Sequence, residues 1–87
     1  MALEEDFAAA QTRVKALSRT PDTSELLELY ALYKQGSSGD VQGSRPGMLD
    51  FKGRAKYDAW SGKRGVAKDA AQRAYVELVT KLAAKYG

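Results

Sequence analysis

The longest regular pattern in the chain is a broad stripe of apolar residues with helical spacing near its C-terminal end. One row repeats at four-residue steps, Val66, Ala70, Ala74, Leu78 and Leu82, and an adjacent row contains Ala67, Ala71, Tyr75, Val79 and Tyr86. A stripe of this width buries itself against more than one neighbour. The pattern therefore predicts a helix from about Val66 to about Lys85 that packs against several others.

Three other segments show the same periodicity, and no segment alternates as a half-buried strand does. They predict helices from about Leu3 to about Leu17, through residues 26–36 as far as Gly36, and from about Phe51 to about Trp60. Phe51 and Trp60 are expected to be the large apolar anchors of the short third helix. Residues 36–47 lack periodicity and contain turn-forming pairs, so they predict an ordered loop. We therefore expect an all-α fold with four helices around one core.

The start of the second predicted helix has two candidate caps. Thr20 precedes Pro21, a residue that suits the first turn of a helix. Asp22 stands three residues before Glu25, which is the spacing of a capping box. The residues alone do not choose between the two.

The chain of 87 residues has the size of one small domain and contains neither cysteine nor histidine. Disulfides, thiol catalysis and the commonest transition-metal sites are therefore excluded, and the usual nucleophile and base pairs of enzymes are missing. No apolar run approaches the roughly 20 residues that span a bilayer, and the N-terminal segment is acidic, unlike a signal peptide. We expect a soluble intracellular protein that is not an enzyme and uses no metal or cofactor.

Positive charge is concentrated in the middle of the chain. The whole chain has a formal net charge of +3, whereas residues 45–64 contain 6 cations and 2 carboxylates, a net charge of +4. Such a segment is typical of an anion-binding site.

Tyrosines and lysines of the second helix suggest what the anion is. Tyr30, Tyr33 and Lys34 stand three and four residues apart, so they project from neighbouring positions. Cations, hydroxyls and aromatic faces suit a phosphorylated, partly flat ligand such as a nucleotide, and the same types recur in Arg54, Lys56 and Tyr75. Without further information Tyr30 and Tyr33 would more often be residues of a core or its rim, and Lys34 and Lys56 would more often be solvated surface residues.

Ordered motifs along the chain resemble the signature of the acyl-CoA-binding protein family. They are Leu29-Tyr30-Ala31-Leu32-Tyr33-Lys34-Gln35 with Gly39-Asp40, the run Arg45-Pro46-Gly47-Met48-Leu49-Asp50-Phe51-Lys52-Gly53-Arg54-Ala55-Lys56-Tyr57-Asp58-Ala59-Trp60, and the C-terminal Ala74-Tyr75-Val76 and Lys85-Tyr86-Gly87. The resemblance covers essentially the whole chain. It implies an up-down-down-up four-helix bundle that forms a single acyl-CoA-binding domain over residues 1–87.

The same resemblance implies a function. A protein of this family binds long-chain fatty acyl-CoA esters in the cytoplasm and acts as a carrier and pool former that leaves the thioester unaltered. It is expected to be a monomer without stable membrane insertion, although transient membrane contact is compatible with the resemblance. The alternative from another class is a small basic helical module that binds nucleic acid. The 11 acidic residues mixed with 14 basic ones disfavour that alternative, so no nucleic-acid partner is expected.

The resemblance also assigns roles to residues by their position in the motifs. Six residues match contacts of the CoA head group: Tyr30, Lys34 and Lys56 at the 3′-phosphate, Tyr33 beside the adenine, Tyr75 on the last helix and Lys15 on the first. Three match the lining of the groove for the acyl chain, namely Leu26, Leu27 and Ala55.

Three positions depart from the family pattern. Thr20 stands where the family often has lysine, so one ancillary cation is missing or is replaced by Arg19. Tyr57 replaces the usual tryptophan and adds a hydroxyl. Val66-Ala67 replaces the usual Thr-Ser pair, which predicts a last helix without a capping hydroxyl at its start.

Overall fold

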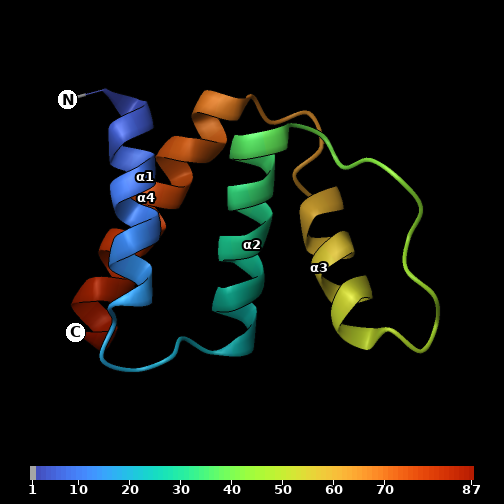
Figure 1. Ribbon diagram of the computed structural model, residues 1–87, viewed down its shortest axis with the longest axis horizontal. Helices are drawn as coiled ribbons and strands as arrows, with labels where there is room; N and C mark the ends of the chain where they lie inside the picture. Colours follow the sequence, from blue (N-terminus) through green and yellow to red (C-terminus); the bar gives the residue numbers. More distant parts are fainter. Residues whose placement is uncertain (1) are drawn as a thin grey trace.

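A computed structural model describes residues 2–87 and contains, within this range, four helices and no strand (Figure 1). The helices are α1 (Leu3–Lys15), α2 (Thr23–Ser38), α3 (Phe51–Ser61) and α4 (Lys68–Tyr86). The all-α, four-helix prediction is confirmed.

The helices follow the up-down-down-up order. In Figure 1, α1 and α4 run in one direction and α2 and α3 in the other, so the loop from α2 to α3 must travel the length of the bundle. Among the described residues, α4 packs against both α1 and α2, whereas α3 packs against no helix other than α2. The molecule is consequently flat, with principal extents of 38 × 28 × 15 Å.

The core lies where α1 and α2 meet α4. Its buried side chains are Phe7 and Ala10 from α1, Leu29 and Leu32 from α2, and Tyr75, Val79 and Leu82 from α4. In α4, Ala71, Tyr75 and Val79 of one apolar row are buried, together with Leu82 at the end of the other row. Ala70, in the other row, is exposed.

The residue that caps the start of α2 is Asp22, not Thr20. The Asp22 carboxylate accepts a hydrogen bond from the Glu25 backbone N–H at 2.9 Å, and the Glu25 side chain accepts one from the Asp22 N–H at 2.9 Å. This reciprocal pair is a capping box, which satisfies two N–H groups at the helix start.

The predicted end of α2 at Gly36 is wrong, because the helix continues to Ser38. Gly39, with φ of 81°, follows the last turn in a backbone conformation that favours glycine. Gly36 instead meets a packing requirement: a Cβ there would lie 3.0 Å from Gln72 Cγ and 3.2 Å from Phe7 Cζ. Its lack of a side chain permits α1, α2 and α4 to approach one another.

The ends of α1, α3 and α4 lie within two residues of their predicted positions. The α4 helix starts at Lys68, and Ala67 before it provides no side-chain cap, as the missing Thr-Ser pair predicts. The α1 helix ends at Lys15, two residues before Leu17.

The two expected anchors of α3 behave differently. Trp60 is half-buried, and its Nε1 donates a hydrogen bond to the Gly39 carbonyl at 2.8 Å. Phe51, in contrast, is 75% exposed, so its prediction as a packing anchor is wrong. It lies in the first turn of α3, which has no buried residue among those that the structure describes.

A buried glutamine connects three parts of the chain near the C-terminal end of α2. Gln35 is fully buried, and its Nε2 donates to Asp40 Oδ1 at 2.9 Å and to the Val66 carbonyl at 2.8 Å. Asp40 Oδ1 also accepts a hydrogen bond from the Gly65 N–H at 2.8 Å. This bond, followed by that from Gln35, holds the pKa of Asp40 below its ordinary value. The network fixes the α3–α4 turn against α2.

Candidate functional site

An open pocket of about 460 Å³ lies between α1 and α2. Within the described residues the backbones of these two helices each lie close to α4 but not to each other, so that only side chains such as Phe7 and Tyr33 meet across the space between them. Its walls come from α1, the α1–α2 loop and α2, with Tyr75 of α4 between them: Gln11, Val14, Lys15, Leu17, Arg19, Thr20, Pro21, Leu26, Leu29, Tyr30, Tyr33 and Tyr75. The volume falls within the usual range for small-molecule sites, about 300–1,000 Å³.

Aromatic side chains close one part of the space between the two helices. The Phe7 ring of α1 lies 6.2 Å from the Tyr33 ring and meets the Tyr75 ring edge-on at 5.2 Å, measured between centroids. Burial raises the pKa of the Tyr75 hydroxyl above its usual value, and Tyr33 adds to the shift. The Tyr75 phenol therefore stays neutral and available as a hydrogen-bond donor over the physiological range.

Five of the predicted site residues line this pocket together: Lys15, Leu26, Tyr30, Tyr33 and Tyr75. Leu26 and Tyr33 are 43% and 38% exposed, which is high for large apolar side chains in a small bundle. They present apolar surface beside a lysine, so the pocket can take a ligand that is both apolar and negatively charged.

Lys34 of α2 and Lys56 of α3 lie outside the pocket, where these two helices face each other. The Lys56 ammonium lies 5.4 Å from the centre of the Tyr30 ring, and the Lys34 ammonium lies 4.9 Å from the centre of the Trp60 ring. Neither lysine takes part in an ion pair within the described residues. Tyr30 both lines the pocket and contacts Lys56, so it joins the pocket to these two cations.

Leu27 and Ala55 are not part of the pocket wall. Both are half-buried, one on α2 and the other on α3. Their assignment to the acyl groove stays a prediction.

The structure adds residues that the sequence prediction omitted. Gln11, Val14 and Leu17 line the pocket from the first helix and its end, and their spacing around Lys15 could have indicated a shared face. Trp60 supports Lys34, but no spacing rule relates two residues on different helices, so the sequence contains no signal for that pair.

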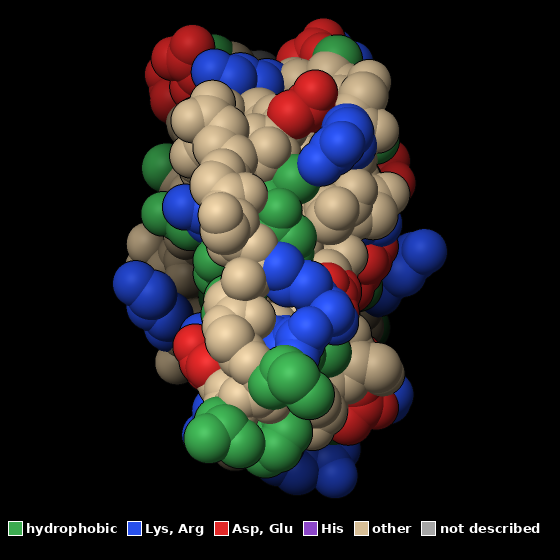
Figure 2. Space-filling model, turned by 90° about the vertical axis from the view of Figure 1, so that its right-hand side faces the viewer, with side chains coloured by type: hydrophobic (Ala, Val, Ile, Leu, Met, Phe, Trp, Pro, Cys, Tyr) green, Lys and Arg blue, Asp and Glu red, His purple; other side chains and the backbone are tan. Residues whose placement is uncertain are grey.

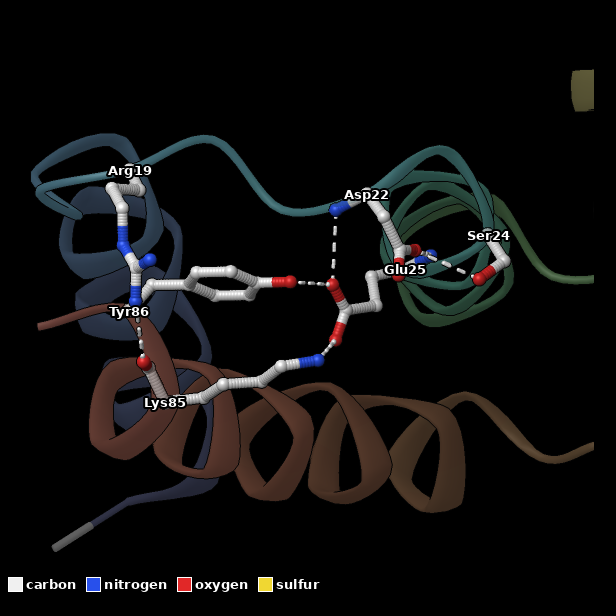
Figure 3. Close-up of polar contacts among 6 residues, drawn as sticks. All are labelled: Arg19, Asp22, Ser24, Glu25, Lys85 and Tyr86. Atoms are coloured by element: carbon white, nitrogen blue, oxygen red, sulfur yellow. Dashed lines mark hydrogen bonds and ion pairs between the residues drawn. The ribbon is translucent and has the colours of Figure 1, made fainter.

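Arg19 is part of the pocket wall, but α4 holds its guanidinium group (Figure 3). The group lies 5.4 Å from the centre of the Tyr86 ring and donates a hydrogen bond to the Lys85 carbonyl at 3.2 Å. Thr20 also lines the pocket. The Arg19 cation is therefore placed near the missing lysine position while it fixes the α1–α2 loop to the end of α4.

Glu25 links the start of α2 to the same part of α4, as Figure 3 shows. Its Oε1 accepts hydrogen bonds from the Asp22 N–H and the Tyr86 hydroxyl, and its Oε2 lies 3.0 Å from the Lys85 Nζ. The Tyr86 hydrogen bond, followed by that from Asp22, holds the pKa of Glu25 below its ordinary value, and Glu25 raises the pKa of Lys85. We call Arg19, Glu25, Lys85 and Tyr86 the C-terminal clamp, because they hold one end of the pocket in place.

A family model described as "Acyl CoA binding protein" matches residues 4–79 of the chain. The chain belongs to the acyl-CoA-binding protein family. It is 56% identical over 87 residues to "Acyl-CoA-binding protein homolog 1" of Caenorhabditis elegans, covering 100% of this chain and 99% of that one. The "Acyl-CoA-binding protein homolog" of Manduca sexta is 49% identical over 88 residues, covering 100% and 98% of the two chains.

A solved structure of the family supports the fold. The crystal structure of Oryza sativa Acyl-CoA-Binding Protein 2 matches with a TM-score of 0.92 at 36% identity, covering 97% of this chain and 93% of that one. One departure from the family pattern acquires a structural role here. The hydroxyl of Tyr57, where the family resemblance leads us to expect tryptophan, donates a hydrogen bond to the Gly43 carbonyl at 3.0 Å and so ties α3 to the long loop.

Within residues 2–87, no helix combines the length and apolar character needed to cross a membrane.

Proposed function

We propose that this protein binds long-chain fatty acyl-CoA esters one to one and acts as an acyl-CoA carrier and pool former. The observation that carries the proposal is the position of Tyr30, which lines an apolar pocket on one side and contacts the Lys56 ammonium on the other. An amphiphile with a phosphorylated head and an apolar tail needs this juxtaposition of cation, hydroxyl and apolar wall. The family relatives are acyl-CoA-binding proteins by name.

Each part of the site has a role in the proposal. Tyr30, Lys34 and Lys56 hold the 3′-phosphate of CoA. The phenol of Tyr33 lies beside the adenine, and Tyr75 and Lys15 complete the head-group site. Leu26 lines the path of the acyl chain, with Leu27 and Ala55 as its continuation towards α3.

Energetics require both parts of the ligand to be recognised. Each buried methylene contributes about 0.8 kcal/mol, and each hydrogen bond to a charged group about 1.5–3 kcal/mol. The acyl chain therefore supplies much of the affinity. Because the pocket is open to solvent, the CoA head group must cover part of the chain, and a free fatty acid should bind far more weakly.

The carrier is proposed to work as a monomeric single domain of residues 1–87 in the cytoplasm and to leave its ligand unaltered. The chain contains neither cysteine nor histidine, the residues that most often activate or attack a thioester. The nucleic-acid alternative gains no support from the relatives, since those described above are named for acyl-CoA.

Calorimetric titration with a long-chain acyl-CoA, free CoA and the matching fatty acid, in one buffer, tests the proposal. Tight one-to-one binding of the ester, with both fragments far weaker, supports it. Equal affinity for the ester and the fatty acid would contradict the role of the head group, and no binding of the ester would contradict the function.

A further inference from the structure

An apolar tip at the start of α3 takes no part in the site described above. It consists of Met48, Leu49 and Phe51, which are 78%, 89% and 75% exposed. Figure 2, which faces the α3 side of the molecule, shows apolar side chains gathered at its lower end with Lys and Arg side chains next to them. Large apolar side chains grouped on the surface indicate an interaction site.

The tip has a defined backbone conformation. The Asp50 N–H donates a hydrogen bond to the Gly47 carbonyl at 3.0 Å, and the Asp50 carboxylate accepts one from the Gly53 N–H at 2.9 Å. Asp50 therefore caps α3 and fixes the turn that presents Met48 and Leu49. The exposure of the tip is a feature of the folded protein.

The charge beside the tip is positive. Residues 48–56 contain Lys52, Arg54 and Lys56 against the single carboxylate of Asp50, a formal charge of +2. Asp50 already accepts the helix-capping hydrogen bond, and Lys52 forms no ion pair with the described residues. A group of exposed apolar side chains beside such cations complements a lipid bilayer with anionic headgroups, which is apolar in its interior and negatively charged at its surface.

The shape of the tip favours a bilayer over a folded partner. A binding groove leaves its apolar residues half-covered by neighbouring walls, whereas the three tip side chains stand almost free of the rest of the protein. We propose that this tip docks on anionic phospholipid bilayers, with Met48, Leu49 and Phe51 entering the interface and Lys52 contacting lipid headgroups.

Docking of the tip would also place the pocket near the membrane, which matters for ligand uptake if the proposed function holds. Phe51 and Lys56 are five residues apart on one helix, a rise of about 7.5 Å along its axis. Docking would therefore bring the Lys56 and Tyr30 side of the pocket close to the headgroup layer. An acyl-CoA that partitions into the bilayer could then reach the site without crossing bulk water.

Flotation of the full-length protein with vesicles, in the absence of acyl-CoA, tests the docking. Vesicles of phosphatidylcholine alone are compared with vesicles that also contain phosphatidylserine, and we expect binding to the anionic vesicles only. The double variant Leu49→Ser/Phe51→Ser should lower partitioning at least about tenfold. Its matched control is Val66→Ser, which removes an apolar side chain that is 37% exposed outside the tip.

A charge reversal tests the headgroup contact separately. Lys52→Glu should weaken binding to the anionic vesicles, whereas Lys81→Glu on α4, which changes the net charge equally, should not. Failure of the wild type to bind anionic vesicles, or unchanged binding by the tip double variant, would overturn the proposal. A wild type that self-associates through the tip, with the double variant monomeric and still bound to vesicles, would overturn it in favour of an interface between copies.

Calorimetry without vesicles separates this inference from the proposed function. The tip double variant should bind acyl-CoA with wild-type affinity, because none of its residues belongs to the pocket. Vesicle binding by a wild type that fails to bind acyl-CoA would refute the proposed function and leave the docking intact. If the wild type binds acyl-CoA but does not bind anionic vesicles, the docking proposal is refuted and the proposed function is not.

Discussion

The Lys56 ammonium lies 5.4 Å from the centre of the Tyr30 ring, across the contact between α3 and α2. A cation held over a ring face in this way gains about 0.5–1 kcal/mol at an exposed site. The contact is therefore weak enough for Lys56 to leave the ring for a phosphate, yet it keeps the ammonium beside the pocket. Lys34 has the same relation to Trp60, at 4.9 Å.

Removal of either ammonium should affect ligand binding much more than folding. We expect Lys34→Ala and Lys56→Ala each to weaken acyl-CoA binding by about 1–3 kcal/mol, because each loses a charged hydrogen bond to phosphate. Calorimetry gives the affinity, and the melting temperature should change little. Lys81→Ala on α4 is the control. A large fall in melting temperature would show that the two lysines are structural.

Acyl-CoA affinity should rise with chain length until the apolar path is filled, since each added methylene is worth about 0.8 kcal/mol when buried. Leu26→Ser should reduce this dependence because Leu26 lines the pocket. Leu27→Ser is the informative comparison: an equal effect would mean that the chain also passes over the α3 side of α2. An unchanged profile from short to long chains in the wild type would contradict the assignment of the groove.

Gln35 should be essential for stability. Replacement by alanine leaves Asp40 and the Val66 carbonyl without their shared donor and creates a cavity in a fully buried position. We expect Gln35→Ala to lower the free energy of unfolding by about 2–4 kcal/mol. Urea denaturation measures the change, and Gln42→Ala, at an exposed position, should have almost no effect. A Gln35→Ala protein as stable as the wild type would disprove the importance of the network.

The C-terminal clamp should make stability depend on pH at the acidic end. The pKa of Glu25 is lower in the folded protein than its ordinary value of 4.5, chiefly because of the Tyr86 hydroxyl. The ionised carboxylate is therefore favoured by folding, so its contribution is complete above the ordinary value and is lost as the pH falls through the folded pKa.

Melting temperatures of the wild type and Glu25→Gln, compared from neutral to acidic pH, test this sign. The wild type should melt higher at neutral pH, and the difference should shrink as the medium becomes acidic. Glu77→Gln removes an exposed carboxylate on α4 outside the clamp and should show no such convergence. A constant difference at all pH values would rule out ionised Glu25 as the cause.

Local patterns in the sequence predict the helices well because helical periodicity is a property of neighbouring residues. The cap of α2 needed the structure to decide it, since Thr20 and Asp22 satisfy the same local rule. Gly36 was misjudged as a helix end because its role is to let Phe7 and Gln72 approach, and those residues come from other helices.

For the pocket too, spacing within one helix could be interpreted from the sequence, whereas contacts between helices could not. The spacing of Tyr30, Tyr33 and Lys34 on one helix, with the family resemblance, identified residues that lie in or beside it. Local reasoning could not reveal that Trp60 supports Lys34, since that contact depends on how α3 packs on α2. The exposure of Phe51 was missed for a related reason: a large apolar residue in a short helix is normally buried, and only the fold shows that nothing covers it.

Within residues 2–87, the α3 helix packs against a single neighbouring helix and contains no buried residue. Its backbone should therefore open by local unfolding far more often than α4, and its amide hydrogens should exchange with solvent correspondingly faster. Because Lys56 belongs to α3, a bound phosphate would hold this helix in place in addition to its packing on α2. Ligand affinity and the opening equilibrium of α3 would then be thermodynamically linked, so that a substitution loosening α3 weakens binding without touching the ligand.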